Sequence, residues 1–326
     1  MSKSSLEDML LKNETMAKKL VPKLFRYRFD PYQKVSKSMN DIWSTLMGNS
    51  SEAMNKYFDD ILNELLEGMG NKEWRVREAS TTAMIQLLQT TPLEKYDNKL
   101  ELIWTMAFRS MDDIKQSVRE VGNKLTQTLS NILVRSIDVN KGVKTEKSSE
   151  ILDVLLPFLL GVKGLNSDAE EIRRFALKTL LNLIENTGSS IKPFVPSLVY
   201  NLTLSLSSLE PQVLNYLTLN ADKYNVSASA LDSRRMQSVT GSPILNSIEK
   251  LIDLCDEDLV EEMVSKVVQA AKKSVGLPSK VGASRVIVFL VLRHFTSLRS
   301  HSGKILKVCF NSLDDRNETV ANSFAI

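Results

Sequence analysis

The chain has 326 residues, of which 43% are hydrophobic and 25% charged, and its 42 lysines and arginines nearly balance 39 aspartates and glutamates. This composition is that of a globular chain and excludes disordered, collagen-like and disulfide-rich proteins, while a net charge of +3 is too small to indicate a nucleic-acid binder without a local basic patch. The chain has only 12 glycines and 9 prolines, about half the share of an average soluble protein, which favours long helices over many short strands.

Nothing in the sequence predicts secretion or a membrane span. The first residues, MSKSSLEDMLLKNE, lack the apolar core of a signal peptide. The longest apolar runs, 154–161 and 286–292, are far shorter than the ~20 residues that a bilayer span needs. The two cysteines, Cys255 and Cys309, fit a reducing compartment. We therefore expect a soluble intracellular protein with no integral membrane association.

A phrase of about 40 residues recurs along the chain. It consists of a short polar turn, a β-branched residue, and then apolar residues at steps of three and four. The β-branched residues are Val35, Val76, Val118, Ile172, Val213, Val281 and Val320. The apolar spacing after each predicts the second helix of a pair. First helices are predicted before the turns, over 57–69, 100–109, 151–160 and 193–206.

The turns carry residues that are typical of helix starts. Four aspartates are each followed three residues later by a glutamine or glutamate, which is the spacing of a capping box. The sequence therefore predicts that the N-caps of four second helices are Asp30, Asp113, Asp168 and Asp315.

Helix pairs of this length are typical of HEAT or armadillo units, which must stack into a solenoid because a single pair cannot bury its apolar face. The predicted fold class is all-α: a HEAT-like α-solenoid, or armadillo-type superhelix, of about seven helix pairs. The predicted organisation is pairs 1–3 over 1–137, an exposed loop over 138–149, pairs 4–5 over 150–220, a polar insertion over 221–242 and pairs 6–7 over 243–326. Since six residues follow Val320, we expect the last helix to be truncated and the array to be a piece of a longer one.

The inventory of reactive residues does not favour an enzyme. No nucleotide, metal or catalytic-triad motif occurs in the sequence. The only histidines are His294 and His301, and a nucleophilic Cys309 beside His301 is disfavoured against a buried thiol and surface imidazoles. We predict no catalytic, cofactor-binding or metal-binding residue, no cofactor and no small-molecule substrate.

One long stretch is basic. Between Met263 and Leu313 lie nine basic residues and no acidic one, which predicts a basic face for an acidic partner. The alternative is a solvated face compensated by neighbouring pairs, and the scarcity of aromatic residues disfavours nucleic acid. The candidate partner-binding residues here are Lys272, Lys273, Lys280, Arg293 and Arg299.

Two further segments combine arginine with aromatic residues, which are favoured interface anchors. Arg26 and Arg28 lie in LVPKLFRYRFDPY, and Trp74 precedes Arg75 in the second turn. We take these four residues as candidate partner contacts, with core packing as the alternative for part of the first segment. A turn tryptophan followed by arginines is also typical of tubulin-binding HEAT arrays, but the acidic turn 111–113 argues against a tubulin face.

Several segments resemble one family. They are LVPKLFRYRFDPY, KEWRVRE (72–78), LNYLTLNADKYN (214–225), GLPSKVGASRVIVFL (276–290), SGKIL (302–306) and LDDRN (313–317). Together they resemble the large HEAT-repeat adaptor and scaffold family of the proteasome, over nearly the whole chain.

This resemblance implies a non-enzymatic protein that links the core and regulatory particles of the proteasome, with a role in assembly quality control and ubiquitin-dependent degradation. It also implies a cytoplasmic and nuclear location. The alternative that the residues leave open is another HEAT-repeat binding scaffold, similar to a transport receptor or a phosphatase scaffold.

Overall fold

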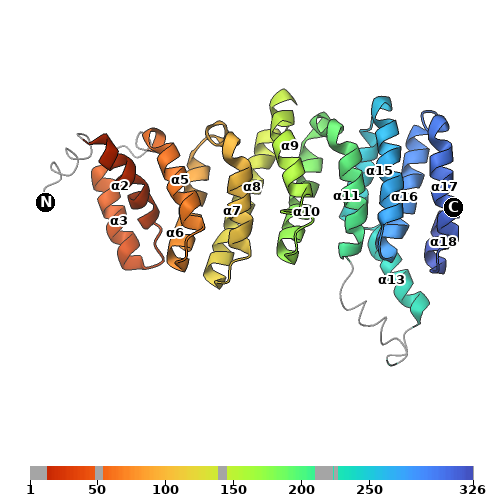
Figure 1. Ribbon diagram of the computed structural model, residues 1–326, viewed down its shortest axis with the longest axis horizontal. Coiled ribbons are helices and arrows are strands. Elements are labelled where there is room, and N and C mark those ends of the chain that lie inside the picture. The colour runs from red at the N-terminus through yellow and green to blue at the C-terminus, as the bar shows by residue number, and fades with distance from the viewer. Residues whose placement is uncertain (1–12, 48–53, 139–144, 210–222, 224–226, 326) are drawn as a thin grey trace. The chain divides into compact units, whose positions relative to one another are not determined.

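The computed structural model describes residues 13–47, 54–138, 145–209, 223 and 227–325. Within these ranges every regular element is a helix and no residue lies in a strand. Figure 1 shows the helices following one another in pairs along the chain. The predicted all-α repeat fold is thus confirmed. None of the helices described is both long enough and apolar enough to cross a membrane.

The chain divides into two compact units, the first comprising Met1–Lys141 and Glu150–Thr179, and the second Gly142–Ser149 and Leu180–Ile326. The helices of the first unit are α2 (Glu14–Tyr27), α3 (Gln33–Leu46), α5 (Phe58–Met69), α6 (Trp74–Thr90), α7 (Leu100–Met111), α8 (Gln116–Ile137), most of α9 (Thr145–Leu160) and the first part of α10 (Glu170–Asn186).

The first unit has two layers of helices. One layer runs through α2, α5 and α7, and α6 packs on α8 in the other, while α5 pairs with α6 and α7 pairs with α8. The apolar spacing read from the sequence faces this core: Ala79, Ala83 and Leu87 of α6 are fully buried. Burial of such side chains, at about 1.5–3 kcal/mol for a large one, holds the pairs together.

In its described residues, the second unit contains the start of α9, the end of α10 and the α-helices α11 (Val195–Ser205), α13 (Ala228–Thr240), α14 (Pro243–Asp253), α15 (Val260–Lys273), α16 (Leu277–His294), α17 (Ser302–Leu313) and α18 (Glu318–Phe324). One layer runs through α11, α15 and α17, and the other through α14, α16 and α18. Helix α13 lies outside the two layers and packs on α16.

The fifth pair differs from the prediction. Helix α14 packs against both α11 and α16, so residues 243–253 supply the second helix of the pair that α11 begins, and the insertion lies between its two helices. The reason is local: Ser242 caps α14 by accepting a hydrogen bond from the Leu245 N–H at 3.1 Å, Pro243 occupies the first turn, and one face of the helix is buried. The phrase around Val213 lies outside the described residues.

The predicted exposed loop over 138–149 is wrong over 145–149. Helix α9 begins at Thr145, and Ser148 is 0% exposed. Ser148 precedes Leu152 and Leu155 by four and seven residues, which places it on the buried face of the helix. Residues 139–144 lie outside the described part.

The predicted aspartate N-caps are also wrong for three of the turns. The N-caps of α3, α8 and α18 are Tyr32, Lys115 and Asn317, each two residues after the aspartate. Each aspartate instead accepts a hydrogen bond from the backbone N–H of that N-cap residue, at 2.8–3.0 Å. This is an Asx turn, and it leaves the second carboxylate oxygen free to reach a neighbouring pair.

Candidate functional site

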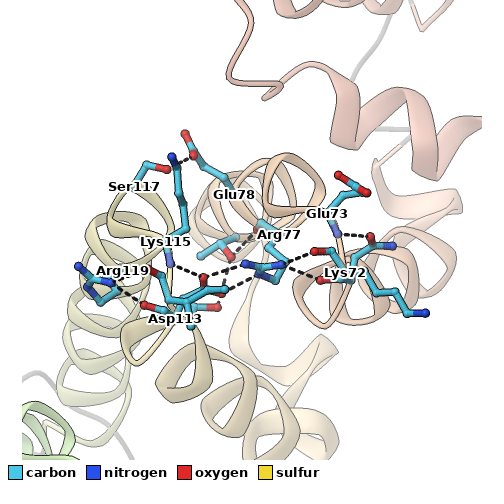
Figure 2. Close-up of polar contacts among 12 residues, drawn as sticks. Lys72, Glu73, Arg77, Glu78, Asp113, Lys115, Ser117 and Arg119 are labelled. Atoms are coloured by element: carbon cyan, nitrogen blue, oxygen red, sulfur yellow. Dashed lines mark hydrogen bonds and ion pairs between the residues drawn. The ribbon is translucent and has the colours of Figure 1, made fainter.

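A densely bonded polar cluster of the first unit is centred on Arg77, in the first turn of α6 (Figure 2). Its guanidinium is buried, and Nη1 donates to the carbonyl oxygens of Asn71 at 3.0 Å and Lys72 at 2.8 Å. Nε and Nη2 donate to the two carboxylate oxygens of Asp113, at 2.6 and 2.8 Å. One side chain therefore joins the turn before α6 to the turn before α8.

The electrostatics of this pair favour the charged forms. Burial alone would raise the pKa of Asp113, but hydrogen bonds from Arg77 and from the Lys115 N–H, with the charges of Arg77 and Arg109, hold that pKa below its usual value. The hydrogen bond to Asp113 raises the pKa of Arg77 in turn. A bidentate arginine–carboxylate contact fixes geometry as well as energy, so the cluster sets the relative position of two successive turns.

The same turn geometry recurs along the first unit. A small polar residue accepts a hydrogen bond from the N–H two residues later, and an arginine six residues later donates Nη1 to two carbonyl oxygens of its own turn. The polar residue and arginine of the three turns are Asn71 with Arg77, Asp113 with Arg119, and Ser167 with Arg173. This six-residue spacing is visible in the sequence but was not among the predicted features.

Trp74 and Arg75, two predicted partner contacts, lie beside this cluster. The guanidinium of Arg75 donates to both oxygens of Asp30, at 2.9 and 3.1 Å, and its Cζ lies 3.8 Å from the centroid of the Tyr32 ring. The Nζ of Lys115 lies 4.8 Å from the centroid of a Trp74 ring. Both residues thus connect successive turns of the first unit, and contact with a partner stays a prediction for them.

Arg26 and Arg28 occupy different environments. Arg26 is 6% exposed and its Nε donates to Glu64 of α5 at 3.1 Å, so its charge is used inside the unit. The burial of Arg26 therefore argues against its predicted role as a contact with a partner protein. Arg28 is only partly buried, and its Nε donates to Asn40 at 2.9 Å.

In the second unit, the predicted basic residues do not gather in one patch. Helix α16 has 18 residues and is therefore about 27 Å long. Lys272, Lys273 and Lys280 lie around its first turns, whereas Arg293 lies in its last turn and Arg299 follows it. The basic stretch is contiguous in sequence but separated in space by the length of a helix.

Two of these five residues form ion pairs. Lys280 contacts Asp315, and its hydrogen bond lowers the pKa of that carboxyl. Arg293 contacts Asp253 at 2.7 Å and Glu249 at 3.5 Å. In the described part of the chain, the exposed basic residues of the 263–313 stretch for which the structure gives no carboxylate partner are Lys272, Lys273, Arg285, Arg299, Lys304 and Lys307.

The GLPSKVGASR segment (276–285) forms the N-cap and first turns of α16 and packs against the end of α11 and the start of the inserted chain. Ser279 is 0% exposed, and its Oγ donates to the Leu204 carbonyl at 2.9 Å and accepts from the Ser207 N–H at 2.9 Å. Gly276 has φ +82°, a conformation that side chains disfavour, and a Cβ on Gly282 would lie 2.1 Å from Leu206. These residue types are therefore needed where the chain enters the insertion.

The thiols lack the features of nucleophiles. Burial, reinforced by the charge of Asp256, raises the pKa of Cys255 to about 11, and burial also raises the pKa of Cys309. A reactive cysteine needs the opposite shift. Within the described residues, no group of three or more His, Cys, Asp and Glu side chains is arranged to hold a metal ion.

Comparison with known proteins gives a relative that matches this chain from its first residue to its last. The Saccharomyces cerevisiae protein "Proteasome component ECM29" is 58% identical over 326 residues, which is 100% of this chain and 18% of that protein. The chain is therefore similar, over all of its residues, to one segment of an ECM29 protein. This confirms the resemblance inferred from the sequence motifs.

Two further members of the ECM29 family match as widely. The Homo sapiens "Proteasome adapter and scaffold protein ECM29" is 36% identical over 94% of this chain and 16% of its own length. The Schizosaccharomyces pombe "Proteasome component ecm29" is 31% identical over 94% of this chain and 18% of its own length. A family model described as the HEAT-repeat domain of proteasome adapter and scaffold protein ECM29 matches residues 191–326. The chain spans less than a fifth of the length of these relatives.

Proposed function

We propose that this chain is a binding segment of a proteasome adaptor and scaffold, which links the core and regulatory particles and takes part in their assembly quality control and in ubiquitin-dependent degradation. The observation that carries the proposal is the 58% identity, over the whole chain, to a protein named as a proteasome component. The name of the human relative adds the adaptor and scaffold role. A cytoplasmic and nuclear location belongs to the same proposal.

The proposed function is non-enzymatic and needs no cofactor, nucleic acid or small-molecule substrate. It is supported by a fold of stacked helix pairs, which offers extended surfaces for binding, and by thiols whose pKa values are raised rather than lowered. The exposed cations around α15 to α17 are the part of the second unit that would attract an acidic surface.

The test is direct binding to purified particles. The tagged chain is incubated with core particles, regulatory particles and the assembled proteasome at several salt concentrations, and co-sedimentation is quantified. We expect retention with at least one particle. Absence of binding to all three, with capture of transport GTPases or phosphatase subunits from lysate, would overturn the adaptor proposal.

A charge-reversed variant tests the contact surface separately. Lys272, Lys304 and Lys307 are changed together to Glu, and the matched control changes Lys19, Lys23 and Lys124, three exposed lysines of the first unit. We expect the first variant to bind less and to lose salt dependence, because exposed charges act through screened attraction. If both variants bind as the wild type does, the basic residues are not the contact, while retention of the wild type still supports the adaptor.

A further inference from the structure

The first unit contains a small polar cavity near the end of α2, and the proteasome proposal does not involve it. Its volume is about 180 Å³, and it is lined by Phe25, Arg28, Met54, Asn55, Gln86, Thr90 and Thr91. Small-molecule pockets usually measure about 300–1,000 Å³, so this cavity suits a compact group rather than a cofactor.

Arg28 brings to this cavity a positive charge that no described carboxylate neutralises. The Cζ atom of its guanidinium lies 4.7 Å from a Trp43 ring centroid, 5.3 Å from that of Phe25 and 5.5 Å from that of Phe29. Its Nε donates to Asn40, and the Nη1 and Nη2 groups donate to no residue in the described part of the chain. Burial lowers the pKa of Arg28, as expected for a partly buried cation without a counter-charge.

Beside the partly exposed Arg28 guanidinium, the same cluster contains a buried donor without an acceptor. Trp43 is 3% exposed, and its Nε1–H has no acceptor among the described residues. Buried donors are nearly always paired, so each exception needs an explanation. Among the described residues, this cluster thus combines one buried donor without an acceptor and one positive charge without a counter-charge.

The other lining groups suit an acceptor ligand. The Asn55 Oδ1 accepts from Lys95, which turns the Asn55 amide N–H₂ away from that lysine and brings a second cation near the cavity. The Thr91 hydroxyl and the Gln86 amide supply further polar groups. A planar guanidinium with two free N–H₂ groups matches the paired oxygens of a phosphate or carboxylate.

From the uncompensated Arg28 guanidinium and this donor-lined cavity, we propose an oxyanion-binding site that takes a phosphate or carboxylate group. The oxyanion contacts the Nη groups of Arg28 and neutralises the charge that the aromatic cluster holds.

The test uses the three tryptophans as reporters. The whole chain is labelled with ¹⁵N at the indole nitrogens and titrated with inorganic phosphate, with acetate, or with chloride at equal ionic strength. We expect the Trp43 signal, assigned with Trp43→Phe, to shift in a saturable way with an oxyanion. Trp74 and the buried, equally unpaired Trp104 should not move.

Variants decide whether Arg28 binds the anion. Arg28→Gln should weaken binding at least about tenfold, and Arg28→Lys should weaken it less because the charge remains. Lys23→Gln, a loss of exposed charge on the helix that Arg28 follows, should leave binding unchanged. If Arg28→Gln shifts the Trp74 and Trp104 signals and so disturbs the fold, Thr91→Val replaces it, and we expect severalfold weaker binding. A Trp43 shift that chloride reproduces, or binding unaffected by these changes, would overturn the proposal.

A phosphoserine peptide and its unphosphorylated form distinguish the source of the group. Tighter binding of the phosphopeptide than of inorganic phosphate would assign the site to an anionic side chain of a polypeptide. Equal affinity would assign it to the free anion.

Discussion

Each unit has an ion pair that joins two successive turns, but the residues of the two ion pairs differ. In the first unit, Arg77 and Asp113 have side chains only 10% and 9% exposed, and the guanidinium makes four hydrogen bonds. In the second unit, the corresponding contact joins Lys280 and Asp315, with side chains 35% and 18% exposed. Since charge interactions strengthen as water is excluded, we expect the first contact to hold its turns together more strongly.

The difference extends to the backbone of the turn. Arg77 satisfies the carbonyl of Lys72, five residues before it, with its own side chain. The carbonyl five residues before Lys280 is that of Val275, and it accepts a hydrogen bond from Ser207, which lies in the 3₁₀ helix Leu206–Leu209 at the start of the insertion. A turn of the first unit is therefore closed by its own helix, and this turn of the second unit by the inserted chain.

Of the changes considered, removal of the Arg77 side chain should lower the stability of the folded chain most. Arg77→Leu leaves the mostly buried Asp113 carboxylate and two carbonyl groups without their partner, and we expect a loss of about 3–5 kcal/mol of stability. The measurement is native-state hydrogen exchange of the α6 and α8 amides, because repeat arrays do not always unfold in one step.

The matched control is Arg119→Leu. The Nη1 of Arg119 donates to the carbonyl oxygens of Asp113 and Ile114 within its own turn, so we expect a loss of about 1 kcal/mol. Equal losses for the two variants would show that the contact between turns adds nothing to the bonds within each turn.

Low pH should weaken the contact between Arg77 and Asp113, because the Asp113 carboxylate becomes protonated. The pKa of this carboxyl is below its usual value in the folded chain, so its stabilisation is fully present above the unfolded pKa, about 3.9, and is lost as pH falls through the folded pKa. We expect Asp113→Asn to be less stable than the wild type at pH 7, with the two stabilities converging toward pH 2. Parallel stability curves for the two proteins would contradict this assignment.

The sequence predicts most of the repeat fold because its signals are local. The spacing of Val76, Ala79, Ala83 and Leu87 is that of one helix face, and three of these side chains are fully buried. The fifth pair could not be predicted in the same way, because α11 and α14 are separated by the insertion. Only packing between distant segments reveals that they belong together.

The candidate sites are less predictable for the same reason. The sequence marks the aspartates of the turns, but the same residue types at the same spacing fit either a capping box or an Asx turn. Only the structure shows that these aspartates form Asx turns and contact a neighbouring helix pair. The contiguous basic stretch suggested one face, whereas a helix of about 27 Å separates Lys272 from Arg293. Arg28 was predicted as a partner contact from its aromatic neighbours, but its missing counter-charge is visible only in three dimensions.

Loss of the Lys280–Asp315 contact in the second unit should lower stability less than loss of the Arg77–Asp113 contact. Lys280→Met removes a partly exposed ammonium and leaves Asp315 enough contact with water to remain charged, so we expect a loss of about 1 kcal/mol or less. Hydrogen exchange of the α16 and α18 amides measures it under the conditions used for Arg77→Leu.

Lys280→Arg sharpens the comparison further. An arginine at this position could bind Asp315 with two groups, yet the Val275 carbonyl that would complete an Arg77-like cluster already accepts from Ser207 at 2.7 Å. We therefore expect a change within about 0.5 kcal/mol in the wild-type background. Combined with Ser207→Ala, which frees that carbonyl, the arginine should stabilise α16 and α18 relative to lysine. If the gain is the same with and without Ser207, the inserted chain does not replace the arginine in closing this turn.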